Sequence, residues 1–267
     1  MKQNLKGQVA LVTGASSGIG AAIAVALAKK GVNLALLARN EERLQKVAEK
    51  ARSFGVDVLC HLADTRNTEQ VNAAVAETIA HFGHLDIACC NAGIYFRCPT
   101  PELTTDQIRK VMETNFYGNL NTAYAVLPHM QQRHSGSIIV TVSMDGKKGV
   151  PPDAAYVASK FALNGFFQVM RQEVRNSGIH VGMLFPSRTD TPQLAHVDCP
   201  KVTPKVSPAV MGNAVVRMLE HRKKEMMVPC LPCKFLAWGD TISPSLGDFL
   251  IRFLKLDGKG PSPADSI

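Results

Sequence analysis

The segment Thr13-Gly14-Ala15-Ser16-Ser17-Gly18-Ile19-Gly20 joins a short apolar run, Val9–Val12, to a stretch of small residues that extends to about Lys30. The apolar run predicts a buried strand, and the stretch that follows predicts a helix. Glycines make such a turn tight and let the backbone approach a pyrophosphate, while the helix N-terminus offers unpaired N–H groups to phosphate oxygens. The segment therefore predicts a dinucleotide-binding turn; a glycine-rich turn without a ligand is the alternative.

Strand and helix patterns alternate beyond this turn. Further strands are expected at 33–38, 56–62, 85–90, 137–143, 179–185 and 225–228. Helices are expected at 41–53, 68–82, 105–133, with a soft interruption near Tyr117-Gly118, and at 154–176 and 208–220. Short strands joined by helices form βαβ crossovers, which require a parallel sheet covered on both faces. The sequence therefore predicts an α/β fold: a single-domain, Rossmann-like, doubly wound parallel sheet of about seven strands.

Composition and charge narrow the class of protein. Hydrophobic residues make up 46% of the 267 residues and charged residues 19%, which is typical of a packed globular protein. The net charge of +8 is spread along the chain without a nucleic-acid recognition motif, so we expect no nucleic-acid partner. We find no signal peptide and no apolar run of about 20 residues, so we expect a cytoplasmic protein with reduced cysteines.

The cysteines and histidines do not form a convincing metal site. Cys89 and Cys90 are adjacent in one strand and so cannot both face the same side of the sheet. Cys230 and Cys233 form a C-x-x-C in a proline-flanked turn, where accidental spacing is favoured over redox or metal chemistry. The histidines, including His61, His81 and His84, show no metal-ligand spacing, and we expect no metal.

The G-x-x-x-G-x-G spacing after Thr13 resembles that of the short-chain dehydrogenase/reductase family. Further motifs follow in the order typical of that family. They are Asn91-Ala92-Gly93 after the fourth strand, Asn115, Ser143 at the end of the fifth strand, Tyr156-x-x-x-Lys160, and Pro186 with Thr191 after the sixth strand, where the family usually has Pro-Gly. The resemblance spans about residues 7–229. It implies a cofactor-binding and catalytic domain at 1–229 and a C-terminal extension at 230–267.

The resemblance also implies which residues bind the nicotinamide cofactor. Asp64 would contact the adenine and Asn91 the adjoining ribose, while Lys160 would hold the nicotinamide ribose. The other cofactor-binding residues implied are Gly14, Ser16, Ser17, Gly18, Ile19, Gly20, Ala92, Gly93, Tyr156, Pro186 and Thr191. The Ser16 and Ser17 hydroxyls have helix capping as an equally favoured alternative role.

Arg39 bears on the choice between the two nicotinamide cofactors. NAD enzymes usually carry an acidic residue at the end of the second strand, where it binds the ribose hydroxyls. Here the strand ends in Ala38-Arg39, and no acidic residue follows until Glu41. Arginine suits a 2′-phosphate, so we predict NADP(H) in preference to NAD(H). An ordinary surface role for Arg39 is the alternative.

Ser143, Tyr156 and Lys160 are the predicted reaction centre. Tyr156 and Lys160 are four residues apart, so their side chains share one face of a helix. A neighbouring ammonium and a positive nicotinamide should lower the tyrosine pKa. In reduction Tyr156 would then protonate the carbonyl oxygen, while Ser143 would donate a hydrogen bond to it. By resemblance, Asn115 would anchor a water-linked proton relay.

The substrate is the least determined feature. Ile94–Phe96, Met144–Val150 and the 187–206 loop follow strand ends, and Tyr95, Phe96, Met144, Val150 and Leu194 favour a partly apolar pocket. Lys147 and Lys148 either attract an acidic substrate at its rim or are merely solvated. We predict a carbonyl reductase acting on C=O and CH–OH groups of apolar or lipid-like molecules. Residues 185–192 look closer to reductases of lipid-like ketones, and a 3-ketoacyl or 3-ketosphinganine type is an alternative. A non-catalytic NADP(H) sensor is the alternative from another class.

Subunit assembly and the C-terminal extension can also be predicted. By resemblance, helices at 105–133 and 154–176 would pair two subunits, giving a homodimer or homotetramer. Near the C-terminus, five apolar residues recur at helical spacing: Leu246, Phe249, Leu250, Phe253 and Leu254. This stripe predicts an amphipathic helix. The helix either covers the pocket, touches a membrane surface peripherally, or packs on the domain or on another subunit.

Overall fold

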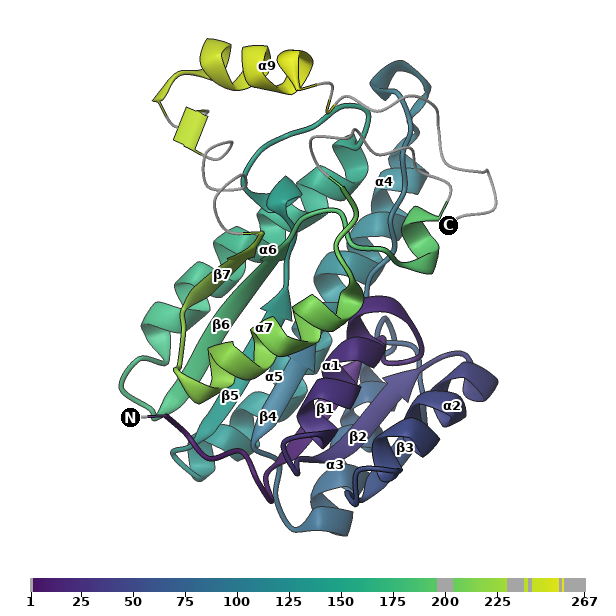
Figure 1. Cartoon of the computed structure of the whole chain (residues 1–267), viewed down its shortest axis with the longest axis vertical. Helices are drawn as coiled ribbons and strands as arrows, with labels where there is room; N and C mark the ends of the chain where they lie inside the picture. Colours follow the sequence, from purple (N-terminus) through teal and green to yellow (C-terminus); the bar gives the residue numbers. More distant parts are fainter. Residues whose placement is uncertain (1, 196–203, 230–237, 240–241, 255, 257–267) are drawn as a thin grey trace.

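The computed structural model describes residues 2–195, 204–229, 238–239, 242–254 and 256. Its centre is a parallel sheet with strand order β3-β2-β1-β4-β5-β6-β7. The strands are β1 (Val9–Thr13), β2 (Asn33–Ala38), β3 (Val58–Leu62), β4 (Ile87–Cys90), β5 (Gly136–Thr141), β6 (Ile179–Pro186) and β7 (Glu225–Val228). The fold class predicted from the sequence, a doubly wound Rossmann-like sheet in one domain, is confirmed (Figure 1).

Helices cover both faces of the sheet. They are α1 (Gly18–Ala28), α2 (Glu41–Arg52), α3 (Thr68–Phe82), α4 (Thr105–Met112), α5 (Gly118–Gln132), α6 (Ala154–Glu173) and α7 (Pro208–Glu220). Polar side chains start several of them: Asn40 accepts a hydrogen bond from the Arg43 nitrogen, and Thr104 forms a capping box with Gln107. Such caps satisfy N–H groups that have no partner within the helix.

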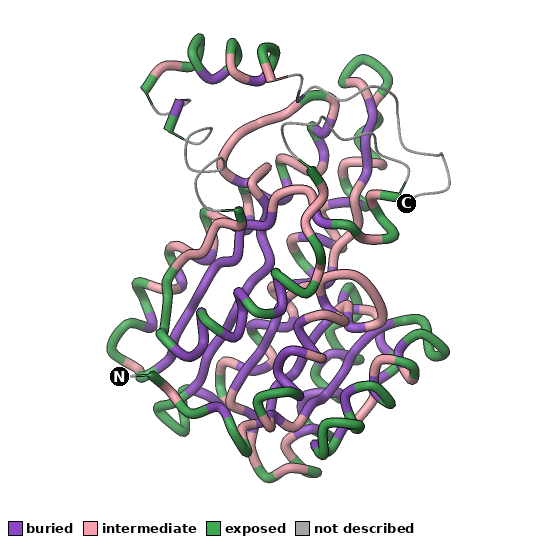
Figure 2. Tube along the Cα trace, viewed as in Figure 1, coloured by how far each residue is buried: buried purple, intermediate pink, exposed green. Residues whose placement is uncertain are grey.

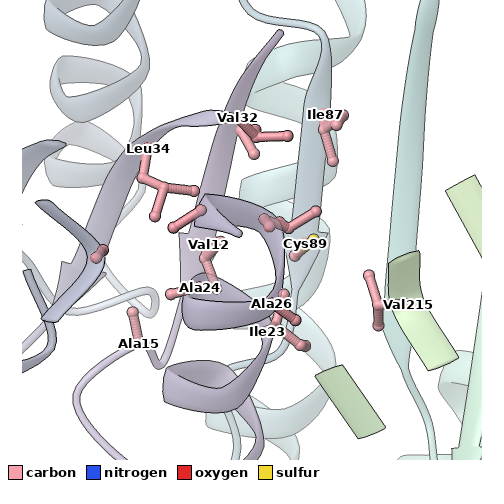
Figure 3. Close-up of a cluster of buried hydrophobic side chains, with 14 of the residues drawn as sticks. Val12, Ala15, Ile23, Ala24, Ala26, Val32, Leu34, Ile87, Cys89 and Val215 are labelled. Atoms are coloured by element: carbon pink, nitrogen blue, oxygen red, sulfur yellow. The ribbon is translucent and has the colours of Figure 1, made fainter. Parts of the chain in front are cut away.

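Two hydrophobic layers hold these helices to the sheet. On one face, residues of α1, α2 and α7 such as Leu27, Leu44 and Val215 pack against the strands. Figure 3 shows part of this layer, with Val215 of α7 near Ile23 and Ala26 of α1. On the other face, α3, α5 and α6 contribute apolar side chains that include Val75, Val126 and Phe167. Both layers are closed to solvent, so the strands appear buried throughout most of the sheet in Figure 2.

The adjacent cysteines of β4 face opposite layers, as their spacing required. Cys89 packs with the α1 side and Cys90 with the α5 side. Burial raises the pKa of the Cys89 thiol to about 12 and that of Cys90 further still. Thiols held neutral in this way are poor nucleophiles and metal ligands. These two cysteines therefore contribute to packing.

The predicted interruption of the long helix is a π-helical turn. Residues Glu113–Tyr117 link α4 to α5, so the irregularity begins four residues before Tyr117. A turn of this kind widens the helix and often lies at a functional site. Here it contains Asn115, whose side chain is fully buried.

The strand order changes direction between β1 and β4. Strands β2 and β3 lie to one side of β1, and β4 to β7 lie to the other. In an open α/β sheet such a switch point creates a crevice outside the carboxyl ends of the strands. The loops that follow β1, β4, β5 and β6 therefore meet at one end of the molecule.

The predicted C-terminal helix is present as α9 (Pro244–Phe253), at this same end of the molecule (Figure 1). Its side chains are not oriented as an apolar stripe packed on the domain would be. Phe249 and Phe253 are exposed and stacked on each other, whereas Gly247 and Ile251 face inward. Within the described residues, no helix has the length and apolar character needed to cross a membrane.

Candidate active site

A cavity of about 730 Å³ lies at the carboxyl ends of the strands. It extends from the turn after β1 and the end of β2 to the loops after β4, β5 and β6. It brings together most residues predicted to contact the cofactor: Gly14, Ser16, Ser17, Gly18, Ile19, Arg39, Asp64, Asn91, Ala92, Gly93, Tyr156, Lys160, Pro186 and Thr191. Gly20 is not part of the wall, because it lies against the back of the turn.

The glycine turn needs its glycines for backbone reasons. Gly14 and Gly18 have φ values of +64° and +55°, a region that residues with a Cβ rarely adopt. A Cβ on Gly20 would collide with the Gly14 carbonyl oxygen. The sequence between these residues therefore forms a tight turn that exposes backbone to the cavity and leads into α1. In a turn of this shape, N–H groups at the helix N-terminus are available to bind phosphate.

Thr13 and Asn91 join the two sides of the switch point. The Thr13 hydroxyl accepts hydrogen bonds from the backbone nitrogens of Asn91, at 3.0 Å, and Ala92, at 3.2 Å. The same hydroxyl donates to the Cys89 carbonyl at 3.3 Å. In return, the Asn91 side chain donates to the Thr13 carbonyl at 3.1 Å. These bonds hold the ends of β1 and β4 at a constant separation beneath the cavity.

Arg39 and Asp64 lie side by side at the β2 end of the cavity. Arg66 binds the Asp64 carboxylate through its Nε and Nη2 atoms, the shortest distance being 2.6 Å. This pair, more than Arg39, holds the pKa of Asp64 below its ordinary value. Arg39 approaches Asp64 only to 3.8 Å, and its side chain is 64% exposed. A cationic side chain is thus presented to the cavity beside a carboxylate that already has a partner.

Ser143, Tyr156 and Lys160 meet on the cavity wall at the ends of β5 and α6. The Lys160 Nζ lies 5.4 Å from the centre of the Tyr156 ring and donates to the Thr141 carbonyl at 3.0 Å. Burial lowers the pKa of Lys160 to about 8. The fold therefore brings together the side chains of Ser143, Tyr156 and Lys160, which were predicted to form the reaction centre.

The expected lowering of the Tyr156 pKa is not found among the protein's own groups. Burial raises this pKa most, the negative charge of Asp145 adds to the rise, and a hydrogen bond to Ser143 opposes it. The expected lowering relied on the Lys160 ammonium and on the positive nicotinamide of a bound cofactor, whereas burial and the carboxylates of Asp145 and Asp153 raise the pKa in the protein itself. Tyr156 is consequently held as a neutral phenol, the form that donates a proton.

Asn115 lies behind the cavity wall and does not line it. Its Nδ2 donates to the Ile94 carbonyl at 2.9 Å and to the Ser159 hydroxyl at 3.0 Å, and its Oδ1 accepts from the Ile94 nitrogen at 2.7 Å. A Cβ on Gly93 would lie 3.2 Å from this Oδ1 and 3.8 Å from the Lys160 Nζ. The π-helical turn thus ties the loop after β4 to α6, next to Lys160.

The residues predicted to line the substrate side of the cavity are partly confirmed. Ile94, Tyr95, Met144, Val150 and Leu194 line it, together with Ile251 and Leu256 from the C-terminal region, which sequence reasoning did not assign. Phe96 does not line the cavity, because it is buried against α4. A C-terminal helix covering the pocket was one of the alternatives expected from the sequence, but the apolar spacing did not single out Ile251.

Lys147 and Lys148 are not the exposed pair expected from the sequence. Lys147 contacts Glu225 at 3.1 Å and Lys148 contacts Asp248 at 3.0 Å, and their side chains are only 18% and 13% exposed. Opposite charges from β7 and α9 hold them. A purely solvated role does not describe them, whereas attraction of an acidic or phosphorylated substrate at the rim stays a prediction, since Lys148 lines the cavity.

Two carboxylates of the site were also missed. Asp145 follows Ser143 by two residues, and Asp153 precedes α6; both line the cavity. Asp153 accepts hydrogen bonds at 2.8 Å from the Tyr95 hydroxyl and at 2.8 Å from the Arg97 Nε, which is buried. Their positions near Ser143 and Tyr156 in sequence were visible, but their burial was not.

The remaining residue predictions concern metals and thiols. His61 is buried against Thr78, while His81 and His84 pair with Asp57 and Asp86. Among the described residues, no group of three or more potential ligands is arranged to hold a metal ion. Cys230 and Cys233 lie outside the described residues.

Comparisons with known proteins agree on one family. A family model described as short chain dehydrogenase matches residues 8–199. The chain is 35% identical over 196 residues to "Dehydrogenase/reductase SDR family member 7B" of Danio rerio, covering 71% of this chain and 63% of that protein, which is less than two thirds of its length. It is 30% identical over 257 residues to "Ketoacyl reductase HetN" of Nostoc sp., covering 93% of this chain and 90% of that protein.

A solved structure supports the same assignment. The alcohol dehydrogenase from the archaeon Thermococcus sibiricus, complexed with 5-hydroxy-NADP, matches at a TM-score of 0.76 and 31% identity, covering 82% of this chain and 95% of that one. The chain belongs to the short-chain dehydrogenase family, whose members bind NAD or NADP and act on small molecules.

Proposed function

We propose that this protein is an NADP(H)-dependent carbonyl reductase that interconverts a ketone or aldehyde with an alcohol. The observation that supports this most is the convergence of Ser143, Tyr156 and Lys160 on the cavity that also receives the glycine turn and Arg39. A nucleotide-binding turn and a proton donor in one continuous cavity suit transfer between a bound dinucleotide and a carbonyl.

The residues present fit a nicotinamide dinucleotide. The turn at Gly14 and Gly18 has no side chain where the diphosphate would lie, and Asn91 to Gly93 line the wall that would face the ribose. Asp64 would meet the adenine, while Pro186 and Thr191 would border the nicotinamide end. When bound, the reduced cofactor supplies the hydride for the carbonyl carbon.

Tyr156 is the proposed proton donor. Its phenol is neutral in the buried site, so it can give its proton to the carbonyl oxygen as negative charge develops there. Ser143 would donate a hydrogen bond to the same oxygen. Lys160 would bind the nicotinamide ribose, and its ammonium would stabilise the phenolate that remains. Asn115 would anchor the route by which a proton returns to the site.

The preference for NADP(H) rests on Arg39. Its exposed guanidinium borders the cavity at the end of β2, beside an Asp64 carboxylate that Arg66 already binds. A 2′-phosphate placed there would gain a charge-assisted hydrogen bond and would displace no essential ion pair. The related alcohol dehydrogenase was solved with an NADP derivative.

The substrate we propose is apolar or lipid-like. Ile94, Met144, Val150, Leu194 and Ile251 form an apolar part of the wall. A 3-ketoacyl or 3-ketosphinganine type of substrate is a more specific alternative, and one relative bears the name ketoacyl reductase. A catalytically silent NADP(H) sensor is the alternative from another class; a complete Ser143, Tyr156 and Lys160 set disfavours it.

Assembly and location follow as parts of the same proposal. Large exposed apolar side chains lie on the π-helical turn and α5, at Tyr117 and Tyr124, and on α6, at Phe161 and Val169, which supports pairing of subunits into a homodimer or homotetramer. The exposed Phe249 and Phe253 of α9 support peripheral membrane contact by an otherwise cytoplasmic enzyme. We retain residues 1–229 as the catalytic domain and 230–267 as its extension.

A turnover assay tests the proposal directly. NADPH oxidation would be followed with aliphatic, aromatic, steroid-like and long-chain ketones. The variant Tyr156→Phe should lower kcat by about 10²- to 10⁴-fold, the usual contribution of a proton donor. Tyr124→Phe, which removes an exposed hydroxyl, serves as the matched control. NADPH binding without turnover of any ketone would instead support the sensor.

A further inference from the structure

The Asp145 carboxylate lies in direct contact with the proposed oxyanion donor. The Ser143 hydroxyl oxygen is 3.1 Å from Asp145 Oδ2, to which it donates, and it accepts from the Asp145 backbone nitrogen, also at 3.1 Å. Asp145 is part of the cavity wall. Burial is the main reason that its pKa rises, to about 6, so near neutrality it carries a negative charge inside the site. Nothing in the proposed reduction uses that charge.

The two carboxylates in this part of the cavity differ in how they are satisfied. Asp153 has both of its oxygens bound, one by the Tyr95 hydroxyl and one by the Arg97 guanidinium. Over the described residues, Asp145 has no ion pair, and Ser143 is the side chain that donates to it. Arg188 and Lys160 act on the Asp145 charge only from longer range, and Asp153 opposes it. Asp145 therefore has one side-chain donor in the part of the chain that the structure describes, the Ser143 hydroxyl, which also contacts Tyr156.

That hydrogen is needed elsewhere during the reaction. A serine hydroxyl has one hydrogen to donate. If Ser143 donates it to the substrate carbonyl, Asp145 loses its side-chain donor while it remains in a confined site. A carboxylate that a bound substrate closes off from water without a donor is costly, so a donor supplied by the substrate would stabilise the productive complex. The serine and the substrate would then exchange hydrogen bonds as the carbonyl binds.

The position of Asp145 limits where such a substrate donor can lie. A carbonyl oxygen bound to Ser143 at about 2.8 Å would be no more than about 6 Å from Asp145 Oδ2, given the 3.1 Å between Ser143 and Asp145. A hydroxyl or ammonium on the carbon next to the carbonyl, or one carbon further, spans this separation. Polar groups on substrate carbons further from the carbonyl would lie beyond Asp145, against the apolar part of the cavity wall.

We propose that Asp145 is a specificity-determining residue that binds a hydroxyl or ammonium group close to the carbonyl, so that the preferred substrates are hydroxy- or amino-substituted ketones. The inference rests on the proposed reductase function and deepens it. The charged and titratable groups around Asp145 are Asp153 from the start of α6, Tyr156 and Lys160 from α6 itself, Tyr95 from the loop after β4, and Arg188 from the loop after β6. The apolar wall would hold the rest of the molecule.

A matched set of ketones tests the inference. Wild-type enzyme and NADPH at pH 7.5 would be given 3-octanone, 2-hydroxyoctan-3-one and freshly neutralised 2-aminooctan-3-one. Because a hydrogen bond to a charged group is stronger than a neutral one, we expect kcat/KM for the substituted ketones to exceed that for 3-octanone by about tenfold or more. In Asp145→Ala this preference should fall to about twofold or less.

Two further variants give the test its controls. Asp145→Asn keeps an acceptor but no charge, so it should retain part of the preference for the hydroxyketone and lose the preference for the aminoketone. Asp57→Asn removes an exposed carboxylate from the loop before β3, at the opposite end of the sheet. It should leave the preferences for the hydroxyketone and for the aminoketone unchanged. Circular dichroism and thermal unfolding would establish that each variant is folded.

Equal preferences in wild type and Asp145→Ala, or no preference in wild type, would overturn the inference while leaving the reductase intact. If none of the three ketones is reduced, the inference is tested by measuring ligand affinities instead of turnover. The affinities of 2-aminooctan-3-ol and 3-octanol in the presence of NADP⁺ would be compared by calorimetry. A preference for the amino alcohol that is lost in Asp145→Ala supports the Asp145 site and overturns only the reductase; equal affinities overturn the inference.

Discussion

The Lys148 Nζ lies 3.0 Å from the Asp248 carboxylate, joining the loop that follows Ser143 to α9 across 100 residues of sequence. A second tie lies nearby, where the Arg188 guanidinium donates to the Leu256 carbonyl at 3.1 Å. Because the Asp248 partner is open to solvent, an ion pair of this kind contributes at most about 1 kcal/mol to stability. Its consequence is positional, since it holds the inward side of α9, with Ile251, against the cavity.

The inward side of α9 should affect substrate binding. Ile251 is 5% exposed and lines the cavity, whereas Phe249 on the same helix is 55% exposed. Ile251→Ala should raise KM for a long-chain ketone by about 3- to 10-fold, because each apolar carbon removed from the contact costs up to about 0.8 kcal/mol. Phe249→Ala should leave KM unchanged in steady-state assays. Equal effects of the two variants would show that α9 contributes only by packing.

The cofactor preference should depend on Arg39. A hydrogen bond to a charged group contributes about 1.5–3 kcal/mol, so Arg39→Ala should weaken NADPH binding by about 10- to 150-fold. NADH has no 2′-phosphate, and its affinity should stay constant. Arg109→Ala, which removes an exposed guanidinium paired with Asp106, is the control. Fluorescence titration with both cofactors measures this. An unchanged NADPH-to-NADH ratio would assign Arg39 an ordinary surface role.

The Asp145 carboxylate, which lines the cavity, should lower the stability of the folded protein above pH 6. Its pKa is about 6 in the folded state and ordinarily 3.8, so between these values folding takes up a proton. The cost is therefore complete above about pH 6 and fades as the pH falls toward 4. Asp145→Asn should raise the free energy of unfolding by about 1–2 kcal/mol at pH 7.5. This is less than the full pKa shift would give, because solvent in the cavity screens the Asp145 charge.

Urea denaturation of wild type and Asp145→Asn across pH 4 to 8 measures this difference. The two proteins should converge near pH 4, where Asp145 is largely protonated in the folded state. A difference that stays constant with pH would mean that the asparagine acts through packing and not through removal of the charge.

The buried ion pair between Arg97 and Asp153 should matter far more for stability than an exposed pair. Both side chains are less than 7% exposed, and the Nε–Oδ1 distance is 2.8 Å. Arg97→Met leaves the Asp153 charge buried without its cation, a change that typically costs about 3–5 kcal/mol. Arg109→Met in the exposed pair with Asp106 should cost less than about 1 kcal/mol.

Chemical denaturation of these two variants makes the comparison. Burial already raises the pKa of Asp153 despite Arg97, and loss of the guanidinium should raise it further. The instability of Arg97→Met should consequently lessen as the pH is lowered. Similar costs for both variants would contradict the importance assigned to the buried pair.

Much of the fold could be predicted because its determinants are local. The strand and helix patterns predicted β2, α3 and α7 to the residue. The predicted helix interruption falls where the π-helical turn ends, but its start at Glu113 was not predicted, since such a turn depends on what Asn115 bonds across the fold and not on helix propensity. The apolar spacing in α9 predicted a helix but not its orientation, because Ile251 and not the Phe249–Phe253 pair faces the cavity.

Some features of the candidate site likewise follow from the local sequence, whereas others depend on the tertiary structure. The glycine turn and the Tyr156–Lys160 pair follow from short spacings, since positive φ angles and one helical face are properties of a few consecutive residues. Only the tertiary structure brings Tyr95 and Arg97 to Asp153, across 58 and 56 residues, and α9 to Lys148, across 100. It also decides that burial raises the pKa of Tyr156 and that Asp145 is charged inside the cavity. Local periodicity determines which elements form; desolvation and distant contacts exist only once those elements have packed.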